Sequence, residues 1–130
     1  MALNPDITKQ LNQKFCMSKR EPDLLFRDIL ESAEKILNYT SGFTKEQFLS
    51  NQLIIDAVIR NFEIIGEAAN RLPDLSKSKL PTLEWNKLRG FRNRLAHDYF
   101  GIDYELVWKT KTMLLPELIT SIKSLLNITE

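Results

Sequence analysis

The sequence predicts an all-α fold, an antiparallel bundle of four to five helices. Apolar residues recur at helical spacing in long segments, and no stretch of useful length alternates apolar and polar residues as a strand would. Connections between these segments are short, which favours antiparallel neighbours. The 130 residues suffice for one domain. We assign residues 18–130 to it and expect 1–17 to be an N-terminal extension, flexible or a loosely attached helix.

The first expected helix runs from about Asp23 to Tyr39. Gly42, a residue suited to a left-handed C-terminal position, follows and stops it. Thr44 and Gln47 then fit a capping box that opens a short helix. One apolar stripe follows the first helix and consists of Phe26, Ile29, Leu30, Ala33, Ile36 and Leu37.

The second long helix spans roughly 51–72 and is stopped by Pro73; its broad apolar face predicts the central, most buried helix. Residues 73–81 are expected to form a loop. A third helix starts near residue 82 or 83 and runs to about 99 or 100. Asp103 is then the expected N-cap of the last helix. The inward seam of that helix is predicted to be Val107, Leu114, Leu118, Ile122 and Leu125.

Composition excludes several classes of protein. Hydrophobic content of 43% and charged content of 27% are those of a globular domain. No apolar run approaches the roughly 18 residues of a membrane span, and the N-terminus lacks the apolar stretch of a signal peptide. The single cysteine, Cys16, cannot form an intrachain disulfide. We therefore expect a cytoplasmic protein without membrane contact.

One segment carries the candidate chemistry. Four cations and no acid lie between Trp85 and His97, in a chain whose formal net charge is only +1: Lys87, Arg89, Arg92 and Arg94. Helical spacing places Leu88, Phe91 and Leu95 on one inward face. The polar residues should then form a strip away from the core, which faces either water or a partner.

These residue types suit RNA cleavage without a metal ion or other cofactor. Attack by a 2′-hydroxyl needs a base, an acid and a cation; histidine titrates near neutral pH and arginine grips phosphate oxygens. No Asp/Glu/His cluster at metal-ligand spacing accompanies Arg92 and His97. Because the chain has 1 histidine, two imidazoles would require two chains. A composite site across a two-fold axis is the resulting hypothesis.

The motif Arg92-x4-His97-x-Tyr99 resembles the R-x4–6-H signature of HEPN ribonucleases, and its context resembles the HepT toxin branch. The resemblance extends over about residues 18–126 and includes the segments 89–103 and 57–69. It implies a HEPN-like helical homodimer that acts as a metal-independent endoribonuclease toxin. It also implies a partner, a minimal nucleotidyltransferase antitoxin that transfers AMP onto the motif tyrosine.

Carried onto this chain, the resemblance makes Arg92 and His97 catalytic and Tyr99 the AMPylated residue. Asn93 would assist phosphate binding or fold the site. The basic strip adds RNA phosphate contacts, for which we name Lys87, Arg89 and Arg94.

Two other functions stay open from the sequence. One is a HEPN-like module that binds RNA or nucleotides without cleaving them. The other is a helical dimerisation partner whose basic strip contacts protein. The acidic pair Glu63 and Glu67 has two interpretations as well: a solvated pair, which we favour, or a pair that orients the arginines of the third helix.

Overall fold

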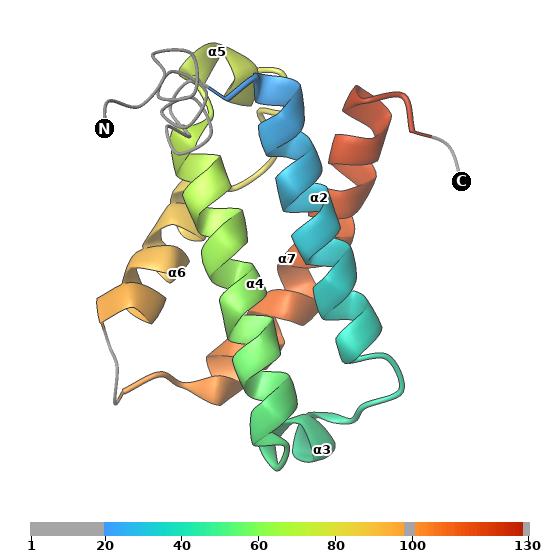
Figure 1. Ribbon diagram of the computed structural model, residues 1–130, viewed down its shortest axis with the longest axis vertical. Coiled ribbons are helices and arrows are strands. Elements are labelled where there is room, and N and C mark those ends of the chain that lie inside the picture. The colour runs from blue at the N-terminus through green and yellow to red at the C-terminus, as the bar shows by residue number, and fades with distance from the viewer. Residues whose placement is uncertain (1–19, 98–100, 129–130) are drawn as a thin grey trace, which may run out of the picture.

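The computed structural model describes residues 20–97 and 101–128 (Figure 1). Within those ranges the regular structure is entirely helical, which confirms the all-α prediction. The helices in chain order are α2 (Pro22–Tyr39), α3 (Lys45–Leu49), α4 (Gln52–Arg71), α5 (Asp74–Lys77), α6 (Trp85–His97) and α7 (Tyr104–Leu125). In the same ranges no helix is long and apolar enough to cross a membrane.

The long helices lie lengthwise beside one another, with α3 and α5 at opposite ends of the molecule (Figure 1). Helix α4 packs most extensively against α2 and also packs along α6, while α7 packs against α2. Consecutive long helices run in opposite directions (Figure 1). Helix α4 is therefore the shared support of α2 and α6, in agreement with its broad apolar face.

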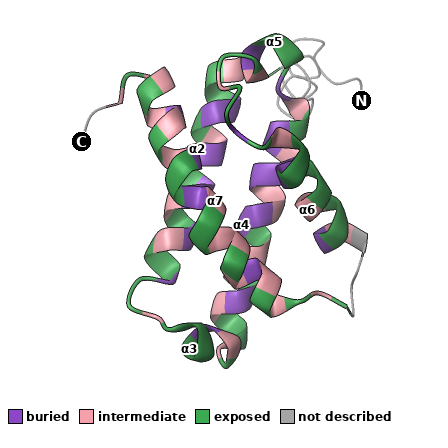
Figure 2. Ribbon diagram, turned by 180° about the vertical axis from the view of Figure 1, so that it is seen from behind, coloured by how far each residue is buried: buried purple, intermediate pink, exposed green. Residues whose placement is uncertain are grey.

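The core lies where α2, α4 and α7 face one another, and Figure 2 shows buried residues on their facing sides. Phe26, Phe48 and Phe62 are among its largest fully buried side chains. Trp85 packs against Phe26 at a centroid distance of 6.4 Å, which ties the start of α6 to α2. These contacts fix α6 at its N-terminal end.

Three predicted helix boundaries are confirmed, at Gly42, Thr44 and Asp103. Gly42 has φ of 79°, in the left-handed region that favours glycine. The Thr44 hydroxyl accepts a hydrogen bond from the Gln47 N–H (3.1 Å), and the Gln47 side chain accepts one from the Thr44 N–H (3.0 Å). The Asp103 side chain caps α7, and that of Asn51 caps α4.

The structure differs from the sequence prediction at three places. Residues 74–77 of the expected loop form the single helical turn α5, because Pro73 and Asp74 carbonyls accept hydrogen bonds from N–H groups four residues on. Helix α6 begins at Trp85 and not at residue 82 or 83 as predicted, because residues 80–83 form a turn that precedes the helix. In α7 the prediction placed Leu114 in the inward seam, but Leu114 is half-buried and its neighbour Leu115 is buried instead. Leu115 lies seven residues before Ile122 and therefore on the same face of the helix.

Candidate active site

Helix α6 carries the candidate residues and is held against α4 by its apolar face. Leu88 and Leu95 are buried, and Phe91 is half-buried. The ring of Phe91 meets that of Phe62 edge-on, with centroids 4.9 Å apart. The inward face predicted from the spacing of these residues is thereby confirmed.

A glycine lets the two helices approach closely. Gly66, in the middle of α4, is buried under the side chain of Arg92. A Cβ atom added at Gly66 would clash with Cβ of Arg92 and lie 2.6 Å from its Cγ, closer than real Cβ atoms approach, while its 3.5 Å distance to the Arg92 Cα is an ordinary contact. The aliphatic stem of Arg92 therefore rests directly on the backbone of α4.

The guanidinium of Arg92 is held by two partners. Its Nη2 forms an ion pair with Oε2 of Glu67 at 2.7 Å, and its Nη1 donates a hydrogen bond to Oδ1 of Asn93 at 3.2 Å. The other carboxylate oxygen of Glu67 accepts a hydrogen bond from Nη2 of Arg71 at 2.9 Å. Glu67 thus bridges two arginines across α4 and α6.

The favoured interpretation of the two glutamates as solvated was therefore wrong for Glu67. Its side chain is 30% exposed and faces α6. Glu63, one turn earlier, pairs instead with Arg60 of its own helix at 3.5 Å.

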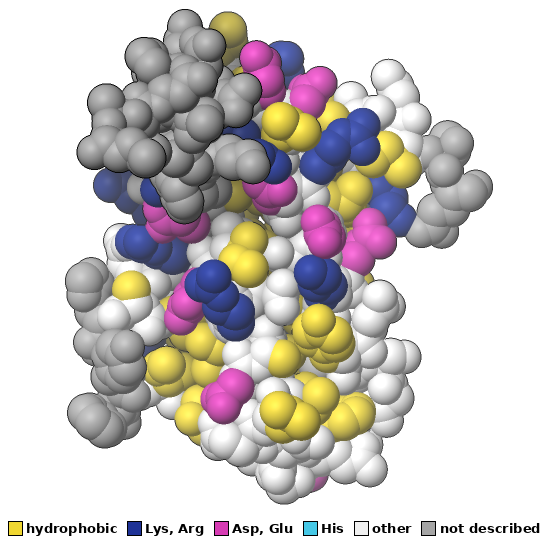
Figure 3. Space-filling model, in the orientation of Figure 1, with side chains coloured by type: hydrophobic (Ala, Val, Ile, Leu, Met, Phe, Trp, Pro, Cys, Tyr) yellow, Lys and Arg dark blue, Asp and Glu magenta, His cyan; other side chains and the backbone are white. Residues whose placement is uncertain are grey.

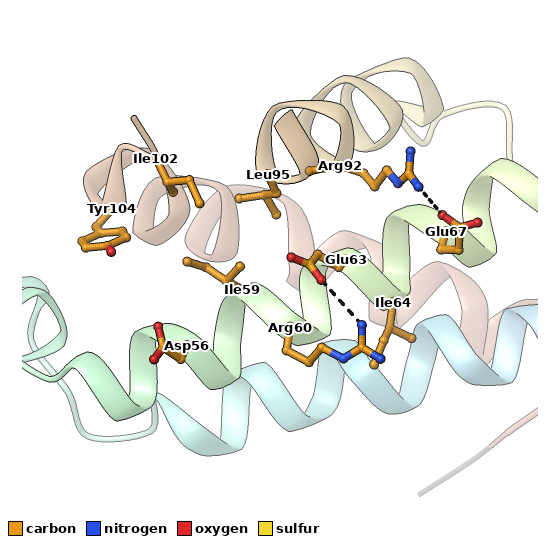
Figure 4. A pocket seen from close by; sticks show the side chains of 11 residues that line it. Asp56, Ile59, Arg60, Glu63, Ile64, Glu67, Arg92, Leu95, Ile102 and Tyr104 are labelled. Atoms are coloured by element: carbon orange, nitrogen blue, oxygen red, sulfur yellow. Dashed lines mark ion pairs between the residues drawn. The ribbon is translucent and has the colours of Figure 1, made fainter. Parts of the chain in front are cut away.

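A pocket of about 710 Å³ opens beside this ion pair, between α4, α6 and the segment 101–104. In Figure 4 the Arg92–Glu67 pair lies at one end, and Tyr104 and Asp56 lie at the other. Apolar side chains also line the pocket: Ile59, Ile64, Leu95, Ala96 and Ile102. The pocket therefore combines one arginine at its rim with an apolar wall.

The structure separates the predicted phosphate-binding cations. Lys87 and Arg94 are seven residues apart and line a second groove of about 510 Å³ between α6 and α7, together with Lys109 and the exposed Met113. Lys87 forms an ion pair with Glu84 at 2.9 Å. Arg89 is exposed. Arg92 thus lies on a different side of α6 from Lys87 and Arg94.

Charges of both signs also mix elsewhere on the surface. On the face drawn in Figure 3, Lys and Arg side chains are interspersed with Asp and Glu. This distribution agrees with the small net charge and shows no single basic patch on that face.

Two of the predicted site residues are described only in part or not at all. The backbone of His97 ends α6, five residues after Arg92, but its side chain lies outside the described part of the molecule. Tyr99 and the extension 1–17 also lie outside it. Of the predicted set, Arg92 and Asn93 are brought together.

Sequence reasoning gave Glu67 as a support for the arginines only in its less favoured interpretation, and it did not find Gly66 or Arg71. Gly66 carried a usable signal, since an isolated glycine inside a helical pattern usually has a packing reason. Arg71 carried none beyond its spacing of four from Glu67. No group of three or more His, Cys, Asp or Glu that could hold a metal ion occurs among the described residues.

The comparisons with known proteins show the family of the chain. The sequence matches the family "Ribonuclease HepT-like" over residues 29–125. The Methanocaldococcus jannaschii protein named "Putative RNase MJ1380" is 44% identical over 93 residues, which cover 72% of this chain and 85% of that protein. The Thermococcus cleftensis protein named "Probable ribonuclease HepT" is 37% identical over 102 residues, which cover 78% of this chain and 92% of that protein.

A third relative, from Caldanaerobacter subterraneus subsp. tengcongensis, is named "Putative RNase TTE0752". It is 32% identical over 108 residues, which cover 83% of this chain and 96% of that protein. No solved structure matches the chain. The family match and these near-full-length relatives establish that the chain belongs to the HepT-like ribonuclease family.

Proposed function

We propose that this protein is a metal-independent endoribonuclease toxin acting in the cytoplasm, with Arg92 and His97 as its catalytic residues. The observation that carries the proposal is the placement of Arg92. Its stem rests on α4, its guanidinium is held by Glu67 and Asn93, and it lies at the rim of a 710 Å³ pocket. An arginine held in this way can meet a phosphate with little loss of side-chain freedom.

The reaction assigns one role to each group. The 2′-oxygen of the RNA attacks phosphorus and the bond to the 5′-oxygen breaks. A base removes the proton of the 2′-hydroxyl, and an acid gives a proton to the departing 5′-oxygen. The guanidinium of Arg92 stabilises the negative charge that builds up on the phosphorus oxygens. His97 serves as base or acid.

A second copy of the chain supplies the second imidazole. One chain contains 1 histidine, so a two-imidazole mechanism needs a homodimer in which Arg92 and His97 of each copy line one cleft. Phosphates farther along the RNA would be met by Lys87, Arg89 and Arg94.

The activity is proposed to be silenced at Tyr99. A cognate nucleotidyltransferase would transfer AMP onto its hydroxyl, and Tyr99 follows Arg92 by seven residues. The added phosphate would compete with RNA for the Arg92 guanidinium. Tyr99→Phe should still cleave RNA and should no longer be neutralised. Full neutralisation of that variant by the antitoxin would exclude Tyr99 as the main target.

The test is RNA cleavage in excess EDTA. Purified protein of unmodified intact mass is incubated with total RNA beside Arg92→Ala, His97→Ala and, as a matched charge control, Arg94→Ala. The parent should cut, the first two variants should lose nearly all activity, and Arg94→Ala should mainly raise KM. Equal cleavage by Arg92→Ala and the parent would refute the assignment. Binding without any cleavage by the parent would indicate a non-catalytic RNA-binding module.

The dimer is tested separately by sedimentation at micromolar concentration. A protein that stays monomeric while cleaving RNA would exclude the composite site. A stable dimer that does not cleave RNA would favour the interpretation as a dimerisation partner.

A further inference from the structure

Three charged side chains form an ion-pair network across α4 and α6. Arg71 donates a hydrogen bond to Oε1 of Glu67 at 2.9 Å, and Oε2 of Glu67 pairs with Nη2 of Arg92 at 2.7 Å. All three side chains are about one-third exposed, at 32%, 30% and 33%. The ion pairs are therefore better shielded from water than those of a fully exposed surface, where such pairs contribute little.

Arg71 fixes the direction of the Glu67 carboxylate. The two residues are four apart on α4, so Arg71 lies one turn beyond Glu67 and occupies one of its oxygens. The other oxygen then points to α6. In Figure 4 Glu67 projects from α4 toward the guanidinium of Arg92, which reaches over from α6.

The balance of charge leaves Arg92 available to an anion. Two arginines and one carboxylate sum to a net charge of +1, so Arg71 offsets the charge of Glu67. A guanidinium carries several N–H donors, and the contacts to Glu67 and Asn93 leave others for phosphate oxygens. A carboxylate in this setting orients the arginine without neutralising the site.

We propose that Glu67, braced by Arg71, is a positioning residue that sets the orientation of the Arg92 guanidinium for the transition state of RNA cleavage. The inference rests on the proposed function. Glu67 does not touch the reacting atoms; it acts through Arg92. Because Gly66 supports the stem of Arg92 and Glu67 holds its head, one turn of α4 determines where the guanidinium lies.

A neighbouring glutamate provides a matched control. Glu63 lies one turn before Glu67 on the same helix and lines the same pocket, but it pairs with Arg60 rather than Arg92. Glu67→Gln and Glu63→Gln each remove one negative charge from the pocket. Any general electrostatic effect on RNA binding should therefore appear in the KM of both variants. The difference in kcat between them reports positioning.

The experiment measures kcat and KM on a defined RNA oligonucleotide for the parent, both glutamine variants and Glu67→Asp. We expect kcat of Glu67→Gln to fall about 10- to 100-fold below that of Glu63→Gln, as misplacement of a catalytic group does. Glu67→Asp keeps the carboxylate and should recover part of that loss. The melting temperature should shift by only a few degrees, since the pair is partly exposed.

Equal kcat values for the two glutamine variants would overturn the inference while leaving the proposed function intact. The inference would also be overturned if kcat/KM of Glu67→Gln were higher than that of the parent and of Glu63→Gln. In that case Glu67 would compete with the substrate phosphate for Arg92. If Glu67→Gln does not fold, Arg71→Gln carries the test: it leaves Glu67 unbraced and should lower kcat. Absence of cleavage by the parent would overturn both proposals.

Discussion

Gly66→Ala isolates the close contact between α4 and α6. Within a helix, alanine is favoured over glycine by about 1 kcal/mol, so the substitution would stabilise α4 if space were free. Here the new methyl group would lie 2.6 Å from Cγ of Arg92, whereas ordinary contacts begin at 3.4 Å. The methyl group would also clash with Cβ of Arg92, which the backbone holds in place, so relief of the clash requires α6 to move by about 1 Å.

The expected magnitudes follow from these two opposing effects. Overpacking costs about 1–3 kcal/mol, so the free energy of unfolding should fall by about 0–2 kcal/mol once the gain in helix propensity is subtracted. Activity is more sensitive, because a displacement of about 1 Å can lower the rate by about 100-fold. Gly66→Ala should therefore remain folded and lose most of its cleavage rate.

Gly90→Ala is the matched control. Gly90 is exposed on α6, and no atom lies within 4 Å of a Cβ placed there. This substitution should raise the free energy of unfolding by about 0.5–1 kcal/mol. Urea unfolding and RNA cleavage are measured for both variants. A Gly66→Ala protein that gains stability as Gly90→Ala does, and cleaves at the parental rate, would refute the close approach of the helices at Arg92.

Two further predictions concern the surface of the molecule. Lys87→Ala and Arg94→Ala should each reduce the slope of log binding constant against log salt concentration by about 0.7, the value for one contact to a single-stranded phosphate. Filter binding of RNA over a series of salt concentrations measures this slope. If a variant keeps the parental slope, the residue replaced in it does not contact a phosphate. Thr44→Ala should lower the free energy of unfolding by about 1 kcal/mol, because the capping box is lost. The kcat should not change, because α3 lies at the end of the molecule away from the Arg92–Glu67 pair. A fall in kcat would show that α3 is coupled to the Arg92 site, which the fold does not predict.

The elements with strong periodicity were predictable from the sequence. The apolar stripe of α2, the broad face of α4, the capping box at Thr44 and the N-cap Asp103 depend on residues close together in the chain. Spacing determines such features directly, because neighbours in a helix recur every three to four residues.

The support of Arg92 depends on contacts between helices, and spacing within one helix does not determine these. The bond from Glu67 to Arg92 joins residues 25 positions apart. Whether Glu63 or Glu67 faces α6 depends on the rotation of α4, which packing against α2 and α6 sets. The spacing of Lys87 and Arg94 from Arg92 places them on a different side of α6, and the rotation of α6 determines which groove each side lines.

The Arg71–Glu67–Arg92 ion-pair network also matters for protein engineering. All the contacts that the structure describes to the side chain of Arg92, the proposed catalytic arginine, come from α4 or from α6 itself. The position of Arg92 therefore depends directly on how α6 packs against α4. Redesign of the groove between α6 and α7, which Lys109 and Met113 of α7 line, should therefore alter RNA preference while Arg92 keeps its position.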